Sequence, residues 1–215
     1  MKLNGAERAW AVIYLVVAAL LLAVACLAPD PAAAQVPSAA AHYRMDLTRA
    51  AHSQWGLDAP VASLAAQVHQ ESGWHPQAVS RVGATGLAQF MPGTAAWWCS
   101  MHPAQDCTPN NPTWALRSLV GYDYYLFARV QGIDACNRFA FALSAYNGGL
   151  GWVNRDRLLA SGKGLDALAW WDSVEGVNAG RTAANWRENR DYPRAILRRT
   201  TPLYVAAGWG QGACP

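Results

Sequence analysis

The sequence has few charges and no dense basic patch. Its formal net charge at pH 7 is +3 over 215 residues. Most of the basic side chains late in the chain are arginines, at Arg181, Arg187, Arg190, Arg194, Arg198 and Arg199. Because nucleic-acid-binding proteins carry denser basic clusters, this spread indicates a solvated helix face. We therefore expect no nucleic-acid partner.

The sequence also lacks internal repeats and the alternation of apolar and polar residues that marks half-buried strands. Apolar residues recur at helical spacing instead, as in Val61, Leu64, Ala65 and Val68. Helices are expected near residues 45–55, 58–72, 94–101, 113–131, 134–146, 152–160 and 181–207. The sequence therefore predicts an all-α fold, a single compact helical domain over residues 42–215.

Turn-forming residues mark several of the expected helix ends. Asp58 is placed to cap the second helix, and Gly73 to end it. Pro193 and Pro202 fall inside the last helical region. Since proline cannot donate the backbone hydrogen bond of a helix interior, we expect interruptions at both.

Near its start, the sequence has a long stretch without charged residues. Lys2 and Arg8 precede an uncharged, apolar run over residues 9–29, and an Ala-x-Ala site ends at Ala34. This order is typical of a secretory signal peptide over residues 1–34. The run is long enough for an uncleaved membrane anchor, and Cys26 leaves lipid attachment open. Residues 35–41, rich in alanine and proline, are expected to form a linker.

Four cysteines remain after the signal segment: Cys99, Cys107, Cys136 and Cys214. An even number in an exported chain indicates disulfides. Four cysteines allow three pairings, of which proximity in sequence favours Cys99–Cys107 with Cys136–Cys214. A zinc site using Cys99, His102 and Cys107 is the alternative, although no fourth ligand is evident.

Carboxylates are scarce in the first half of the domain. Glu71 is the only one between Asp58 and Asp106. It lies at the end of an apolar helix, and helical spacing places it on the face of Val68. A buried carboxyl has a raised pKa and can hold a proton for delivery to a leaving group. The alternative from periodicity alone is a surface glutamate at a helix end.

Glu71 opens a motif that favours the catalytic interpretation. The string ESGWHPQAVSRVGATGLAQFMPGTA resembles the signature of the soluble lytic transglycosylases, whose domain is similar to goose-type lysozyme. The matching positions are Glu71, Ser72, Trp74, Pro76, Ala78, Ser80, Gly83, Ala84, Gly86, Leu87, Gln89, Met91, Pro92 and Thr94. A second block appears at residues 145–149, Ala-Tyr-Asn-Gly-Gly, and a looser third one at Tyr192, Ile196 and Leu197.

The resemblance implies a reaction with one carboxyl, whereas ordinary glycosidases use two. Glu71 would protonate the oxygen between N-acetylmuramic acid and N-acetylglucosamine in peptidoglycan. It would then take the proton of the muramic 6-hydroxyl, which closes on C1 to give a 1,6-anhydro product. No metal or cofactor is expected. His69 and His75 flank Glu71, but their spacing does not fit the two histidines of a zinc protease.

The remaining site residues follow from the resemblance by matching position. Tyr146 would place its hydroxyl near Glu71 and help orient it, and Asn147 would bond a sugar. Ser80 and Gln89 would bind muramic side groups, and Met91 would give apolar contact. Structural roles compete for Ser80 in a turn, Asn147 at a helix end and Tyr146 in the core.

Two other functions stay open. A goose-type muramidase would hydrolyse the same bond and needs a second acid, such as Asp106 or Asp123. An inactive glycan-binding assembly protein is the other. The glycan strands of peptidoglycan are the expected partner, and a secretion or conjugation apparatus or a phage is the biological setting suggested by analogy. The expected location is the periplasm or cell envelope.

Overall fold

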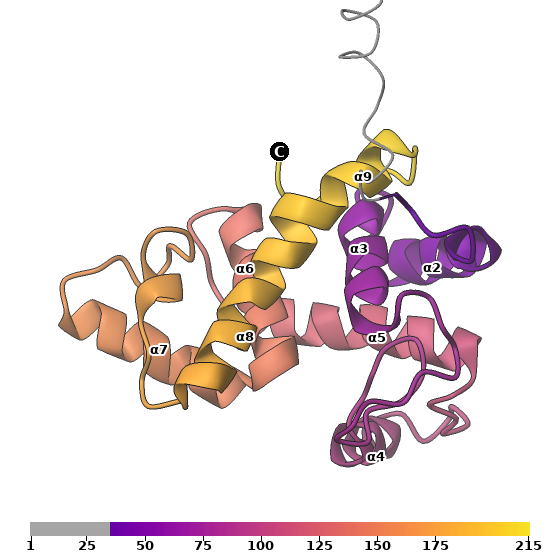
Figure 1. The fold of residues 1–215 in the computed structure, drawn as a ribbon, viewed down its shortest axis with the longest axis horizontal. Helices are drawn as coiled ribbons and strands as arrows, with labels where there is room; N and C mark the ends of the chain where they lie inside the picture. The colour runs from indigo at the N-terminus through magenta and orange to yellow at the C-terminus, as the bar shows by residue number, and fades with distance from the viewer. Residues whose placement is uncertain (1–34) are drawn as a thin grey trace, which may run out of the picture. The chain divides into compact units, whose positions relative to one another are not determined.

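The computed structural model describes residues 35–215, so the expected signal segment over residues 1–34 lies outside the described residues. The helices are α2 (Ala40–Trp55), α3 (Val61–Ser72), α4 (Pro92–Met101), α5 (Pro112–Phe127), α6 (Ala135–Gly148), α7 (Leu150–Gly162), η1 (Val174–Gly176), α8 (Ala183–Arg194), η2 (Ala195–Thr200) and α9 (Thr201–Ala206) (Figure 1). Across residues 35–215, β-structure is limited to isolated bridges around Thr85. The predicted all-α fold class is confirmed.

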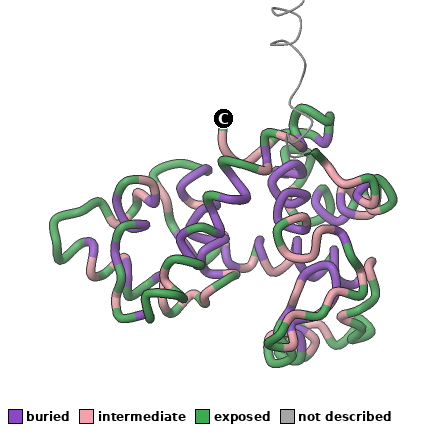
Figure 2. The backbone as a smooth tube through the Cα atoms, viewed as in Figure 1, coloured by how far each residue is buried: buried purple, intermediate pink, exposed green. Residues whose placement is uncertain are grey.

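Helix α3 lies at the centre of the hydrophobic core. All residues from Val61 to Val68 are buried, and α2, α9 and η2 pack against this helix. Helix α5 contacts both α2 and α6, and α6 in turn contacts α7 and α8. Buried segments accordingly follow α3, α5 and α6 in Figure 2. The helix that carries Glu71 is therefore a central element with little freedom to move.

The C-terminal segment caps α3, and the predicted cap at Asp58 is wrong. The residue before α3 is Pro60, with no side-chain cap. Instead, the carbonyl of Gln211 accepts the Ala62 amide at 3.1 Å, and Ser63 Oγ accepts the Ala213 amide at 2.9 Å. A distant segment thus satisfies the free amide of Ala62 at the helix start, which no local pattern reveals.

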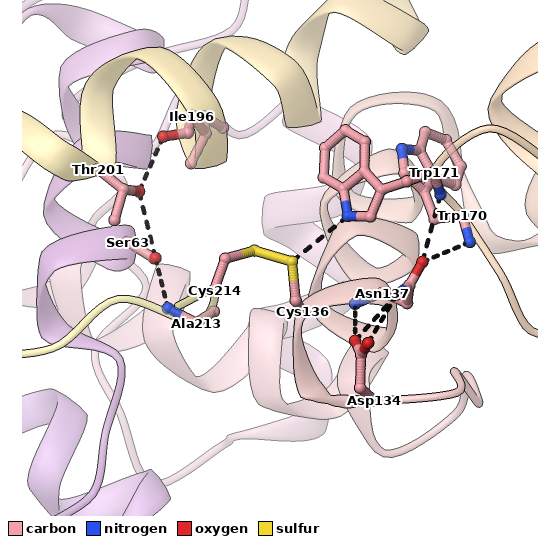
Figure 3. Close-up of a disulfide and its surroundings, with 10 residues drawn as sticks. All are labelled: Ser63, Asp134, Cys136, Asn137, Trp170, Trp171, Ile196, Thr201, Ala213 and Cys214. Carbon is pink, nitrogen blue, oxygen red and sulfur yellow. Dashed lines mark hydrogen bonds between the residues drawn. A yellow bond between two sulfur atoms is a disulfide. The ribbon is translucent and has the colours of Figure 1, made fainter.

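Both disulfides have the pairing that proximity in sequence favours. Cys99 bonds Cys107, and Cys136 bonds Cys214. Figure 3 shows the second bridge between the start of α6 and the segment that caps α3 at Ser63. Cys136 Sγ also accepts the indole N–H of Trp171 at 3.3 Å. This disulfide thus holds the capping segment in place.

Replacing Cys136 and Cys214 with serine is expected to destabilise the fold by about 2–4 kcal/mol, because the bridge closes a long loop. The sequence separation is 78 residues, against 8 for Cys99–Cys107. Urea unfolding of both double-serine variants measures the difference, and the Cys99–Cys107 variant is the matched control. Equal losses in the two variants would contradict the role assigned to the capping segment.

The last helical region is continuous, contrary to the interruptions expected at Pro193 and Pro202. Pro193 lies inside α8, and the backbone continues as a π-helix over Ala195–Thr200 into α9. A π-helical turn is one way to absorb a missing helical hydrogen bond. Pro202 lies in the first turn of α9, where proline is tolerated.

The start of the described chain differs from the expected linker at residues 35–41. Helix α2 already begins at Ala40, which is fully buried. None of the helices within residues 35–215 has the length and apolar character needed to span a bilayer.

Candidate active site

Glu71 lies in the last turn of α3, which ends where Gly73 adopts a left-handed conformation. The side chain is half-buried. The hydroxyl of Tyr192, from α8, donates a hydrogen bond to Glu71 Oε1. Two helices far apart in the chain therefore meet at this carboxyl.

Burial raises the pKa of Glu71 from 4.5 to about 8. The Tyr192 hydrogen bond opposes this rise, and the negative charge of Glu188 adds to it. Burial also keeps the pKa of Tyr192 well above its ordinary value, so Tyr192 remains a donor. At neutral pH the carboxyl of Glu71 is protonated and able to act as an acid.

Glu71 opens into a pocket of about 200 Å³. The pocket is lined by Gln70, Glu71, Asn147, Glu188, Asp191 and Tyr192. A second, polar pocket of about 430 Å³ shares Asn147 and Glu188 with it. The two pockets extend along α8 from the end of α3. Together they leave space for an elongated ligand on one side of Glu71.

Asn147 is held at the boundary of the two pockets. Its Oδ1 accepts a bond from Asn189 Nδ2 at 2.9 Å. Asn189 Oδ1 in turn accepts from Ser144 Oγ at 2.8 Å and from Arg190 Nη1 at 2.5 Å. Because its oxygen is engaged, the Asn147 amide N–H groups are the ones left to meet a ligand.

A buried network of charged side chains connects to Asn147 through Asn189. Asp156 is fully buried and accepts bonds from Arg181 and from Arg190, the latter at 2.7 Å. It also accepts the Ala179 amide at 2.9 Å. The charges of Asp156 and Arg190 are thus linked through Asn189 to Asn147 at the pocket.

The loop after α3 packs back against the end of that helix. Ser72 Oγ donates to the Leu87 carbonyl at 3.1 Å. Ser80 Oγ accepts the Ala84 amide at 2.9 Å, and Gln89 Nε2 donates to the carbonyls of Ala78 and Gly86. The predicted site residues Ser80 and Gln89 therefore bond the loop backbone.

Met91 follows the same loop and is 43% exposed. It immediately precedes α4. Its thioether is available for contact at the surface, whereas it does not line the pocket around Glu71.

The tyrosine that donates to Glu71 differs from the expected one. The hydroxyl of Tyr146 donates to the Ala88 carbonyl at 2.7 Å, and its ring stacks against Tyr192 with 6.5 Å between centroids. Tyr146 thus ties α6 to the loop and supports Tyr192 from behind. The sequence signal for Tyr192 was the third, looser block, in which it stands with Ile196 and Leu197.

The side chains considered as alternative metal ligands are bonded to other residues or exposed. Cys99 and Cys107 are joined in a disulfide, which leaves no thiolate for zinc. His69 Nδ1 lies 3.2 Å from the Tyr204 hydroxyl, and His75 is exposed. Within residues 35–215, no cluster of three or more histidine, cysteine or acidic side chains has a geometry suited to a metal ion.

Comparisons with known proteins show what this chain is similar to. Residues 46–168 match the family described as "Transglycosylase SLT domain". The "Soluble lytic murein transglycosylase" of Escherichia coli (strain K12) is 31% identical over 163 residues, which cover 73% of this chain and 24% of that protein. The "Membrane-bound lytic murein transglycosylase F" of Maricaulis maris is 36% identical over 116 residues, covering 52% and 24% respectively.

A solved structure is similar as well. A complex of the 70-kDa soluble lytic transglycosylase with bulgecin A aligns with a TM-score of 0.57 and 25% identity, over 80% of this chain and 25% of that one. The chain therefore spans about a quarter of the length of these relatives.

Proposed function

Because the chain belongs to the Transglycosylase SLT domain family, we propose that it is a lytic transglycosylase of peptidoglycan. It cleaves the β-1,4 bond between N-acetylmuramic acid and N-acetylglucosamine without water and leaves a 1,6-anhydro end. The observation that carries this proposal is the half-buried Glu71, whose raised pKa and Tyr192 partner prepare one carboxyl for both proton transfers.

In the first step, Glu71 donates its proton to the glycosidic oxygen. The bond from C1 of the muramic residue to that oxygen breaks, and the N-acetylglucosamine side leaves as an alcohol. With the pKa of Glu71 near 8, most molecules hold this proton at neutral pH. The new carboxylate is stabilised by the Tyr192 hydroxyl that already points at it.

In the second step, the same carboxylate takes the proton of the muramic 6-hydroxyl. The 6-oxygen bonds C1 and closes the anhydro ring, so that Glu71 returns to its protonated form. A carboxylate with a pKa near 8 is a stronger base than an ordinary glutamate. The same desolvation therefore serves both steps.

The other predicted residues contribute in two ways. Asn147 lines the pocket, and we assign it hydrogen bonding to a sugar through its amide N–H groups. Met91 supplies apolar contact from the loop. Ser80, Gln89 and Tyr146 bond backbone carbonyls or amides around residues 78–90, and they shape the wall that receives the muramic side groups.

The hydrolytic alternative has less support. Asp106 is exposed in the loop between Cys99 and Cys107, and Asp123 is fully buried beneath α3. Neither lines the pocket of Glu71, where the other acids are Glu188 and Asp191. Asp191 is engaged with Arg199 at 2.8 Å. A muramidase would have to position its water with Glu188.

Mass spectrometry of the products tests the proposal. Purified peptidoglycan is digested with residues 35–215. Muropeptides lighter by one water, without a reducing end, are expected. Hydrated products would instead establish the muramidase, and a wall that stays intact with this chain but not with a muramidase would favour the glycan-binding protein.

Replacing Tyr192 with phenylalanine is expected to lower kcat by about tenfold and to shift the alkaline limb of the pH profile upward. The hydroxyl stabilises the carboxylate of Glu71 and so lowers its pKa. Without that bond the pKa rises further, and Glu71 becomes a weaker acid in the first step because the carboxylate it leaves is no longer stabilised. The pH dependence of kcat measures the shift.

Tyr204 provides the matched control for that experiment. It is a buried tyrosine whose hydroxyl accepts the Trp74 indole N–H at 2.5 Å and lies 3.2 Å from His69 Nδ1, without a hydrogen bond to Glu71. Tyr204→Phe is expected to leave the alkaline limb in place. A limb that moves equally in both variants would remove Tyr192 from the mechanism.

We also propose that the protein works in the cell envelope, exported by residues 1–34, where it opens the wall locally for a secretion or conjugation apparatus or for a phage. Mass determination of the mature N-terminus, with fractionation of the producing cell, tests the location. Recovery of the intact chain in the cytosol would contradict it.

A further inference from the structure

A buried carboxyl, that of Asp123, lies next to the helix turn that precedes Glu71. It has no role in the two proton-transfer steps proposed for Glu71. Asp123 of α5 and Gln67 of α3 are both fully buried. Gln67 Nε2 donates to Asp123 Oδ1 at 3.2 Å. Gln67 precedes Glu71 by four residues, which is one turn of the same helix face.

Each member of this pair keeps one polar atom without a partner. Asp123 Oδ2 and Gln67 Oε1 are both buried without a hydrogen bond. Two unpaired acceptors side by side in a protein interior are costly. A single hydrogen placed between the carboxyl and the amide would satisfy both atoms, and a protonated carboxyl supplies such a donor.

Within residues 35–215, the titratable groups that act on Asp123 include no cation to balance a negative charge. Glu71 faces it from α3, Tyr146 from α6, Tyr192 from α8 and Tyr122 from its own helix. None of the salt bridges within residues 35–215 involves Asp123. A buried carboxylate without a cation protonates rather than remain charged.

We propose that Asp123 stays protonated and donates from Oδ2 to Gln67 Oε1, so that the acid and the amide exchange two hydrogen bonds beneath Glu71. The pair anchors α3 to α5 one turn before Glu71 and makes Asp123 a positioning residue. This role in catalysis rests on the proposed function, whereas the protonation itself does not.

The neutral Gln67–Asp123 pair also allows Glu71 to act first as an acid and then as a base. Burial raises the pKa of Asp123 well above its ordinary value, and an ionised Glu71 raises it further. Both effects favour keeping the proton on Asp123 when Glu71 becomes a carboxylate. A charge on Asp123 would raise the pKa of Glu71 further and oppose the transfer of its proton to the glycosidic oxygen.

Comparison of wild type with Asp123→Asn tests the protonation without any substrate. An asparagine amide preserves both hydrogen bonds but cannot ionise. Unfolding of the wild type releases the proton of Asp123 above the ordinary aspartate pKa of about 3.9, while unfolding of the variant releases none from this position. Between pH 5 and 7, the unfolding constant of wild type relative to D123N should rise about tenfold per pH unit.

Asp156→Asn is the matched control, because Asp156 is equally buried but lies between Arg181 and Arg190. This variant is expected to unfold more readily than wild type throughout the range. A ratio of wild type to D123N that stays constant from pH 5 to 7 would overturn the proposal, because it would mean that Asp123 is charged in the folded protein.

Infrared spectroscopy gives an independent measurement. Against an E71Q background, which removes the protonated carboxyl of Glu71, a carbonyl band of a protonated acid is expected at pH 7 and should vanish in E71Q/D123N. Absence of the band from E71Q would also overturn the proposal. These two measurements remain decisive even if the protein shows no activity on peptidoglycan.

The positioning role has its own readout. Asp123→Leu is expected to lower kcat at least tenfold, and Asp123→Asn to restore most of it with the alkaline limb unmoved. If D123N shifts that limb to lower pH, Asp123 is charged in the wild type. If D123N is as impaired as D123L, the carboxylic acid itself is required and the positioning role is wrong.

Discussion

Glu71→Gln is expected to lower the rate of glycosidic bond cleavage by roughly 10⁴-fold, since one residue supplies both the acid and the base. Glutamine keeps the shape of the side chain and accepts the Tyr192 hydrogen bond, but it transfers no proton. The measurement is the release of anhydromuropeptides from purified peptidoglycan. Full activity of this variant would exclude Glu71 as the catalytic group.

The same variant is expected to be more stable than the wild type at pH 7. The folded pKa of Glu71 is raised from 4.5 to about 8, so its contribution to stability is complete below pH 4.5 and is lost as the pH rises toward 8. At pH 7 the loss is at most about 3 kcal/mol, and glutamine avoids it. Urea unfolding at pH 5 and pH 7 should show the difference growing with pH.

Asp106→Asn is a suitable control for both measurements. Asp106 is an exposed acid in the loop between Cys99 and Cys107. It is expected to change neither activity nor stability measurably. A loss of activity in D106N would revive the hydrolytic mechanism with Asp106 as its second acid.

Asp156→Asn is expected to destabilise the protein by about 3–5 kcal/mol, because it leaves two buried guanidinium groups without their counter-charge. Arg181 and Arg190 both bond Asp156 Oδ2. The network continues through Asn189 to Asn147, so the surviving folded enzyme is also expected to show a raised KM. Denaturant unfolding and substrate titration measure the two effects.

Asp46→Asn is the matched surface variant for that prediction. Asp46 pairs with Arg49 at 3.2 Å, with side chains 42% and 70% exposed. Such exposed pairs contribute little, so a change under about 0.5 kcal/mol is expected. Similar losses of unfolding free energy in D46N and D156N would contradict the large stabilisation assigned to the buried Asp156 network.

Several features were predictable because they depend on neighbours in the chain. Helical spacing of Val61, Leu64, Ala65 and Val68 predicted the buried helix, and Gly73 predicted its end. The motif that opens at Glu71 indicated the acid. Proximity in sequence favoured the disulfide between Cys99 and Cys107, which the structure contains.

Other features depend on contacts between distant segments, and local patterns do not specify which residues make those contacts. The predicted partner of Glu71 was Tyr146, whereas Tyr192 donates to it across 121 positions. The predicted cap of α3 was Asp58, whereas the carbonyl of Gln211 accepts the Ala62 amide. Pro193 was expected to end a helix that instead continues through a π-helical turn.

The sequence by itself determined the all-α class and the helix that carries Glu71, and it singled out Glu71 as the proposed acid, since these follow from periodicity and motif spacing. Only the tertiary structure decided how Glu71 ionises and what surrounds it. Desolvation, the Tyr192 hydrogen bond and the Gln67–Asp123 pair arise from α3, α5 and α8 packing together. A pKa depends on everything within a few ångströms in space, and most of those groups are far away in the chain.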